Sequence, residues 1–255
     1  MTQGIQLEIT PAAGKQLIAK GLLSRADVQD ALENHIVVII SGTTNAEIAA
    51  EILARQDILF QKRGFYRGIV KPAEPVPTFP PVPPVPARAE DIVLVRGEWK
   101  EGQTIYDIAS SLGSKDIIFK GANAVHPESR TAGILIGNPQ TGTIGPCQAA
   151  AVGRRTTLIH PVGLEKRVDR PVYELAQLVN DPSVNGPHLY PTVGIPYTEL
   201  DAIEDLCGIR PVLIAAGGVA GYEGVVRLLC KGDEEQLAKV KDLYLSVKDA
   251  PNYIL

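Results

Sequence analysis

Short apolar runs alternate along the chain with longer segments in which apolar residues recur at helical spacing. The short runs are rich in β-branched residues, which is typical of strands buried on both faces of a sheet. They predict strands over residues 35–40, 91–95, 117–120, 156–162 and 211–216. The longer segments predict helices over residues 11–22, 25–32, 46–54, 104–112, 146–152, 170–179, 198–206, 222–230 and 234–247. This alternation predicts an α/β fold: a mainly parallel sheet with helices on both faces, in a Rossmann-like three-layer arrangement.

Residues that favour helix starts support several of these boundaries. Thr10 directly precedes Pro11, as an N-cap precedes a proline at the first helical position. Ser24 and Thr104 are placed to cap the helices that follow them. We therefore expect side-chain capping at all three positions.

Residues 1–255 are predicted to form a single α/β domain, in which residues 1–34 are a leading helical segment. Residues 72–87 hold eight of the chain's 20 prolines. Because proline excludes helices and inner strands, this segment is predicted to be an extended linker or a strap across the surface. A ligand for a proline-reading domain is the alternative.

Composition narrows the classes of partner. The chain has 255 residues, is 45% hydrophobic and carries a formal net charge of −4, so it can bury a full core and has no basic footprint for nucleic acid. No apolar run approaches the roughly 20 residues that span a bilayer, and the amino terminus does not resemble a signal peptide. We expect a cytoplasmic protein that does not bind membranes, and a homo-oligomer on general grounds.

Cysteines and histidines give no metal or redox signature. Cys147, Cys207 and Cys230 are too few and too scattered for a disulfide framework, and no pair has the Cys-x-x-Cys spacing. The four histidines show no metal-ligand spacing. Neither a metal nor a cofactor is therefore expected.

The loop from Ser41 to Asn45 is the first candidate site. It follows a predicted strand and opens a helix, where free backbone N–H groups attract anions and hydroxyl groups add donors. The same residue types serve equally well as caps and turns. Because no Gly-Lys-Ser/Thr sequence is present, a nucleoside-triphosphate loop is not expected.

Two further loops follow the strand at 117–120. In the first, Asn123 could bind a ligand hydroxyl and His126 could titrate near neutrality, with Glu128 close by; an ordinary turn is the alternative. The second, residues 137–145, is glycine-rich and leads into a helix whose first turn holds Cys147. The helix dipole could activate that thiol, or the cysteine could be a small buried residue.

The last glycine-rich loop, at residues 217–221, is similar to a dinucleotide fingerprint but lacks its first glycine. It also has too little chain after it for the usual unit that binds the ribose. Tight packing of a helix on a strand is the simpler interpretation.

Three segments resemble the superfold shared by ribose-5-phosphate isomerases, CoA transferases, glucosamine-phosphate deaminases and sugar-phosphate sensing domains. Residues 39–45, IISGTTN, are similar to its phosphate-binding loop. Residues 117–128, IIFKGANAVHPE, with the glycine-rich loop and helix after them, resemble the isomerase pattern of an Asp-Gly-Ala-Asp turn before a Lys-Gly-Gly-Gly loop. Residues 156–168 match the following strand and basic turn.

The chain departs from the isomerase pattern at its acids. Lys120 and Asn123 stand where the pattern has aspartates, and residues 135–138, LIGN, replace the lysine and glycines. Aldose–ketose isomerisation needs a carboxylate base, so isomerase activity is disfavoured. No glutamate can be assigned as the nucleophile of CoA transfer.

The sequence thus predicts binding of a small phosphorylated or carboxylated metabolite, by a sensor or by a divergent enzyme of the isomerase/CoA-transferase-like type. The alternatives are an active enzyme that uses His126, Glu128 or Cys147, and a structural protein without a metabolite site. The expected ligand-binding residues are Ser41, Gly42, Thr43, Thr44, Asn45, Gly121, Asn123, His126, Gly137, Asn138, Thr141, Gly142, Thr143 and Gly145.

Overall fold

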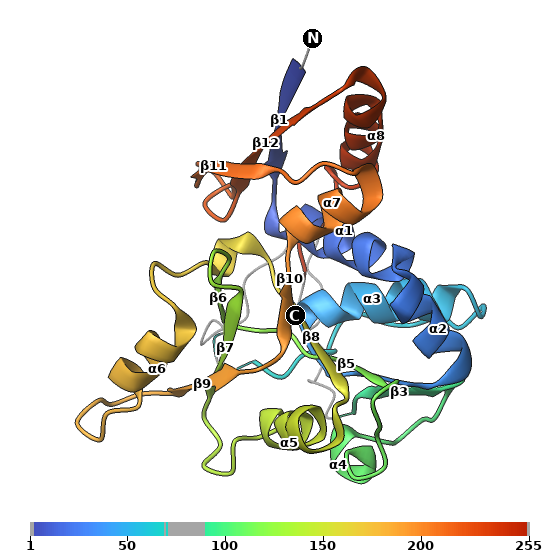
Figure 1. Cartoon of the computed structure of the whole chain (residues 1–255), viewed down its shortest axis with the longest axis vertical. Coiled ribbons are helices and arrows are strands. Elements are labelled where there is room, and N and C mark those ends of the chain that lie inside the picture. The colour runs from blue at the N-terminus through green and yellow to red at the C-terminus, as the bar shows by residue number, and fades with distance from the viewer. Residues whose placement is uncertain (1–2, 69, 71–89, 254–255) are drawn as a thin grey trace.

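The computed structural model describes residues 3–68, 70 and 90–253. The proline-rich segment predicted as a linker or strap, residues 72–87, lies outside the described residues. The elements form three separate sheets and the helices that pack on them (Figure 1).

The largest sheet has six strands in the order β10-β8-β5-β2-β3-β4. Their bounds are β2 Ile36–Ile39, β3 Ile92–Val95, β4 Glu98–Trp99, β5 Ile117–Phe119, β8 Thr157–Pro161 and β10 Ile195–Tyr197. Strands β10, β8, β5 and β2 are parallel to one another, whereas β3 and β4 are antiparallel to their neighbours. The sheet is therefore mixed, which confirms the α/β class but only part of the expected parallel arrangement.

Alternate residues of these strands enter two different hydrophobic clusters. Val37 and Ile39 pack with α1, α2, α3 and α7, whereas Val38 and Ile40 pack with α4, α5 and the β6–β7 hairpin. The sheet is thus buried on both sides, which explains why its strands form unbroken apolar runs in the sequence. The helices are α1 Pro11–Ser24, α2 Ala26–Asn34, α3 Thr43–Ala54, α4 Ile105–Ile108, α5 Ile144–Arg154 and α7 Glu199–Cys207.

A second, antiparallel sheet lies beside the first, in the order β6-β7-β9. Its strands are β6 Ala124–His126, β7 Thr131–Ile136 and β9 His188–Thr192. Helix α6, Val172–Val179, packs on it through Val172 and Ala176, and the short helix η1 spans Leu164–Lys166. None of these three strands was predicted from the sequence. One of them, β6, takes up residues expected to belong to a polar site loop.

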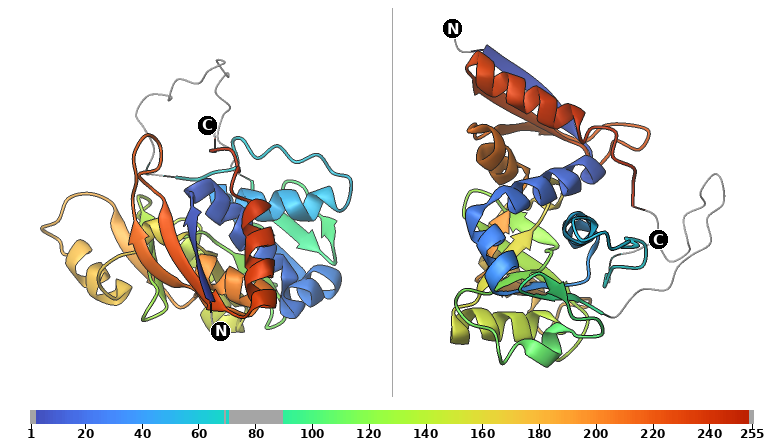
Figure 2. Two further views of the ribbon diagram at one scale, coloured as in Figure 1. Left: turned by 90° about the horizontal axis from the view of Figure 1, so that it is seen from above. Right: turned by 90° about the vertical axis from the view of Figure 1, so that its right-hand side faces the viewer.

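The third sheet, of order β1-β12-β11, joins the two ends of the chain and lies at one end of the molecule (Figure 2). Its elements are β1 Gln3–Ile9, β11 Val212–Ala216 and β12 Val226–Gly232, with α8 Glu234–Leu245 packed beside them. The leading segment therefore starts with a strand, not a helix. The predicted helix over 222–230 is also wrong, because β12 occupies most of it.

This arrangement also removes the dinucleotide interpretation of residues 217–221. The loop joins two antiparallel strands, β11 and β12, whereas the fingerprint needs a strand followed by a helix. Nor does it pack a helix tightly on a strand, as the simpler interpretation proposed.

The predicted helix caps are confirmed at two of three positions. The Thr10 hydroxyl accepts a hydrogen bond from the backbone N–H of Ala13, and Thr104 forms a capping box with Asp107. The prediction for Ser24 is wrong. This residue ends α1 and its hydroxyl donates to the Gly21 carbonyl, while Arg25 precedes α2 without a side-chain cap.

Candidate functional site

The carboxyl ends of the four parallel strands lie along one edge of the central sheet, where α/β proteins usually bind ligands. Ser41 follows β2, and Lys120 follows the neighbouring strand β5. Strand β3 runs in the opposite direction and pairs Ile92 with Ile39, so Asp91, which directly precedes β3, lies at this same edge. Three polar residues that are distant in sequence are thereby brought to the centre of the sheet edge.

Asp91 is a buried carboxylate whose two oxygens are both engaged. Oδ1 accepts the backbone N–H of Ser41 at 3.1 Å and pairs with Nη1 of Arg67 at 2.9 Å. Oδ2 accepts the backbone N–H of Ile105, the first residue of α4, at 3.0 Å. Asp91 therefore ties the end of β2 and the start of α4 together, and Arg67 balances its charge.

Lys120 is partly exposed, and its Nζ makes no hydrogen bond or ion pair within the described residues. Burial among protein atoms lowers the pKa of its ammonium, against the opposing effects of Cys147 and Asp91. A lysine without a bound carboxylate at a strand end is a group available to a ligand, either as a cation or as a neutral amine.

Cys147 lies in the first turns of α5, close enough to Lys120 for the charges of the two groups to influence each other. Its side chain is buried, and burial raises the pKa of the thiol to about 12. The helix dipole therefore does not produce a thiolate here, and the structure favours the alternative of a small buried helix residue.

The start of α3 is fixed to the sheet edge by Asn45. Its Nδ2 donates to the carbonyls of Ile40 at 2.7 Å and Phe119 at 2.9 Å, which end β2 and β5. Its Oδ1 and the hydroxyl of Ser41 are buried without a hydrogen-bond partner in the described structure. Ser41 is only 6% exposed, so an unsatisfied hydroxyl there is costly unless a ligand or water binds it.

Gly42, Thr43 and Thr44 complete this loop. Gly42 is the N-cap of α3 and offers no side-chain cap, so the first-turn amides of Thr43 and Thr44 have no capping side chain. Such amides attract anions. Of the three predicted loops, residues 41–45 are the one whose backbone and side chains retain unused donors at the sheet edge.

The buried side chain of His160, in β8, forms a hydrogen bond with the main chain of Lys120. The pKa of His160 is lowered by burial to about 4, so its ring is neutral. Because a carbonyl oxygen can only accept, Nδ1 donates to the Lys120 carbonyl at 2.5 Å. Nε2 lies 3.0 Å from the Thr192 hydroxyl, which itself donates to Oε1 of Gln148. Any side chain at Gly194 would overlap the His160 ring, so that glycine makes room for the interaction.

The residues predicted on the β6–β7 hairpin make contacts within the hairpin. Oδ1 of Asn123 accepts the backbone N–H of Leu135 at 3.1 Å, and Nδ1 of His126 contacts the Ser129 hydroxyl at 2.8 Å. Glu128 is exposed in the turn between the strands. Gly121 alone remains at the sheet edge, directly after Lys120.

The glycine-rich loop at 137–145 is exposed over residues 137–140, is at least partly buried after them, and is stabilised by its own contacts. Oδ1 of Asn138 accepts the backbone N–H of Gln140, and the Thr141 hydroxyl donates to the Gln140 carbonyl. Thr141 and Gly142 both have positive φ, and Thr143 precedes α5 without a side-chain cap. Gly145 packs against Thr141. The loop carries the chain to the start of α5, near Lys120.

A second acidic group lies further along the same edge, where Glu199 begins α7 after β10. Its carboxylate is buried and accepts the backbone N–H of Leu164 at 3.0 Å. Burial, followed by the negative charge of Glu165, raises the pKa of this carboxyl. Folding therefore favours the protonated form of Glu199.

Replacing Glu199 with glutamine is expected to stabilise the protein increasingly as pH rises. A carboxyl whose folded pKa exceeds its unfolded pKa contributes stability at low pH, and loses it as pH rises through the folded pKa. Urea denaturation would be measured at about pH 4, below the ordinary glutamate pKa of about 4.3, and at about pH 9, above the raised value. The gain should appear only at the higher pH, and the exposed Glu174→Gln variant should show none; a gain of equal size at both pH values would contradict the shift.

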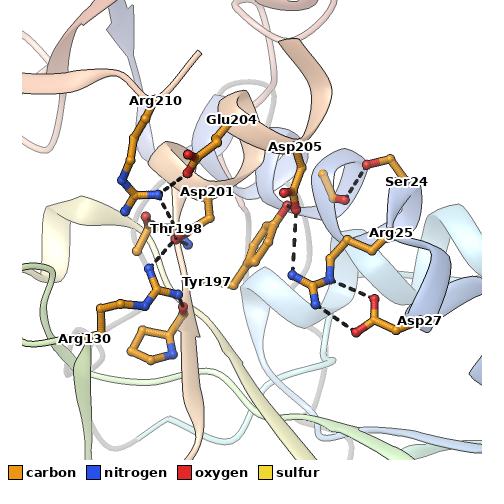
Figure 3. A network of polar contacts seen from close by, with 12 residues as sticks. Ser24, Arg25, Asp27, Arg130, Tyr197, Thr198, Asp201, Glu204, Asp205 and Arg210 are labelled. Carbon is orange, nitrogen blue, oxygen red and sulfur yellow. Dashed lines mark hydrogen bonds and ion pairs between the residues drawn. The ribbon is translucent and has the colours of Figure 1, made fainter. Parts of the chain in front are cut away.

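A polar network that the sequence did not reveal lies at the start of α7 (Figure 3). The buried carboxylate of Asp201 accepts from Arg130 at 2.9 Å, from Arg210 at 3.1 Å and from the backbone and hydroxyl of Thr198. Arg130 has a φ of 50° in the hairpin turn, and reaches Asp201 across 71 residues of sequence. These contacts hold the hairpin sheet against β10 and α7.

The sequence did not predict that Asp91, Arg67 and Lys120 form part of a site at the sheet edge. Asp91 was included only as the start of a strand, and Arg67 was not singled out. Lys120 was noted only as a departure from the isomerase pattern. A charged residue at the end of a β-branched run was the one available signal, and it does not specify a function.

The part of the chain that the structure describes shows neither a metal-binding cluster nor a membrane-spanning helix. Among the described residues, no group of three or more His, Cys, Asp or Glu side chains is arranged to hold a metal ion. In the same part of the chain, no helix has the length and apolar character needed to cross a membrane.

Comparison with known proteins finds no relative: no family model, curated protein or solved structure matches the chain.

Proposed function

We propose that this protein binds a small anionic metabolite, phosphorylated or carboxylated, over the ends of β2 and β5. It would act as a sensor or as a divergent enzyme of the isomerase/CoA-transferase-like type that the sequence resembles. The observation that carries the proposal is Lys120, whose Nζ has no partner within the described residues although Asp91 is close enough to affect its pKa.

Two features of the same edge support an anionic ligand. Within the described residues the buried Ser41 hydroxyl lacks a partner, and α3 begins at the sheet edge where ligands enter α/β proteins. Lys120 and Ser41 follow neighbouring parallel strands, which are paired through Ile39 and Phe119. One small anion could therefore contact both residues.

The other two interpretations have less support. The contacts of His126 hold a turn, Glu128 is exposed beside it, and the thiol of Cys147 is buried and neutral, so none is prepared for catalysis. A purely structural protein does not account for a lysine and a buried hydroxyl that both lack partners among the described residues at the same sheet edge.

A thermal-shift panel tests the proposal with inorganic phosphate, ribose 5-phosphate, acetyl-CoA and citrate as probes. A ligand that binds only the folded state adds about 2.7 kcal/mol at a hundredfold excess over its dissociation constant. At least one probe should stabilise the wild type, and Lys120→Met and Ser41→Ala should weaken that effect.

Lys115→Met is the matched control, because Lys115 is an exposed lysine in the turn before β5. It removes the same charge from the same part of the chain and should leave the ligand-induced shift intact. Absence of any shift in the wild type, or equal losses in Lys115→Met and Lys120→Met, would refute the proposed site.

A further inference from the structure

The geometry points to a covalent role for Lys120: we infer that its Nζ forms an imine with a carbonyl compound that also carries an anionic group, such as a 2-oxo acid or an open-chain sugar phosphate. This inference rests on the proposed anion site, and names its substrate class. Two features of Lys120 support it: the main chain is fixed by hydrogen bonds, and Nζ makes no hydrogen bond or ion pair with the described residues.

The main chain of Lys120 is held on both sides. Its N–H donates to the Ile159 carbonyl at 3.0 Å, and its carbonyl accepts from His160 at 2.5 Å. The residue before it, Phe119, is fully buried between β2 and β8. The base of the side chain is therefore fixed at a strand end, which suits a nucleophile that must meet a bound carbonyl in one geometry.

No carboxylate among the described residues forms an ion pair with the amine. Both oxygens of Asp91 are occupied by two backbone N–H groups and Arg67, and no other carboxylate pairs with Lys120 in the described structure. Arg67 adds a positive charge nearby. These surroundings disfavour the protonated form, and the lowered pKa of Lys120 agrees with them.

Another lysine with a pKa lowered by burial offers a contrast. Lys15 of α1 lies over the ring of Tyr253, 5.7 Å from its centroid. Besides burial, the positive charge of Lys166 lowers its pKa, whereas the carboxylates of Glu165 and Glu47 raise it. Its ammonium therefore has both an aromatic face and negative charges beside it. Burial alone does not distinguish the two residues. Within the described residues they differ because Lys15 has an aromatic contact and Lys120 Nζ has none.

The reaction balances without an oxidant or reductant. The Nζ lone pair attacks the carbonyl carbon, an N–C bond forms, and the carbonyl oxygen takes up a proton as nitrogen loses one. The resulting carbinolamine expels its hydroxyl group as water, with the second proton from nitrogen, and a C=N bond remains. The anionic group of the substrate would meanwhile contact Ser41 and the first turn of α3.

Reductive trapping tests the inference on the full chain. Pyruvate, glyoxylate and ribose 5-phosphate would be incubated separately with the protein and sodium cyanoborohydride at neutral pH, and the adduct located by peptide mass spectrometry. We expect one dominant adduct on Lys120. It should be lost in Lys120→Arg, which keeps the positive charge, and retained in Lys115→Met and Lys15→Met.

The failures of the two proposals can be told apart. If phosphate stabilises both the wild type and Lys120→Arg but no probe labels Lys120, the imine is refuted and the anion site stands. If the label spreads over exposed lysines, or falls on Lys15 instead, the inference is also refuted. If neither stabilisation nor labelling occurs, both proposals fail.

Discussion

Replacing Asp91 with alanine is expected to lower the free energy of unfolding by about 3–5 kcal/mol. The substitution removes the acceptor of two buried backbone N–H groups, those of Ser41 and Ile105, and leaves Arg67 without its carboxylate. Each donor left unsatisfied costs the free energy of its lost hydration, about 1–3 kcal/mol. Because these contacts join β2 to the start of α4, we also expect the sheet edge around Lys120 to loosen.

Urea denaturation of three variants separates the loss of the buried carboxylate's hydrogen bonds from the loss of a helix cap. Asp91→Asn keeps one acceptor oxygen and should lose less stability than Asp91→Ala. Asp107→Ala removes the exposed capping carboxylate of the same helix, α4, and should cost only about 1 kcal/mol. A loss for Asp91→Ala no larger than that for Asp107→Ala would mean that the buried carboxylate contributes only a helix cap.

The central sheet was the part of the fold most accessible from sequence. Its inner strands β2, β5 and β8 are buried on both faces, so each stands out as a run of β-branched and aromatic residues. Caps such as Thr10 act within three residues and were equally readable. Both signals are local. The strands were confirmed, and the caps were confirmed at Thr10 and Thr104 but not at Ser24.

Strand β11 of the terminal sheet matches the strand predicted over residues 211–216, but β1 and β12 were missed because they depend on partners far along the chain. Residues 226–230 of β12 alternate between buried and partly exposed positions, which is the pattern of a strand with one covered face. Without β1, whose Leu7 pairs with Leu228, the same apolar residues also fit a helix. Only long-range pairing selects the strand.

In the candidate site, too, the part formed by neighbouring residues was predicted and the part that depends on long-range contacts was not. The Ser41–Asn45 loop was predicted because a strand, a small polar loop and a helix follow one another directly. Asp91 joins it through a hydrogen bond that spans 50 residues of sequence, which no local pattern encodes. Asn123 and His126 looked like site residues because their types suit ligands, but such side chains also stabilise turns.

Replacing Gly21 with valine is expected to lower the free energy of unfolding by about 3 kcal/mol, at the upper end of the cost of overpacking. A Cβ at this position of α1 would lie 2.7 Å from both Cα and Cβ of Ala202 in α7. It would also lie 2.5 Å from the Tyr197 hydroxyl, which donates to Asp205 at 2.8 Å. The two helices must therefore separate, or Tyr197 must lose its hydrogen bond.

A pair of glycine-to-alanine variants isolates this packing effect from helix propensity. In a helix interior, alanine is favoured over glycine by about 1 kcal/mol. At Gly153 of α5 an added Cβ meets nothing within 4 Å, so Gly153→Ala should stabilise the protein. Gly21→Ala makes the same chemical change but should destabilise it by about 1–3 kcal/mol, because the overlap with Ala202 outweighs the propensity gain. Denaturation midpoints that rise in both variants would show that α1 and α7 do not pack as closely as the structure indicates.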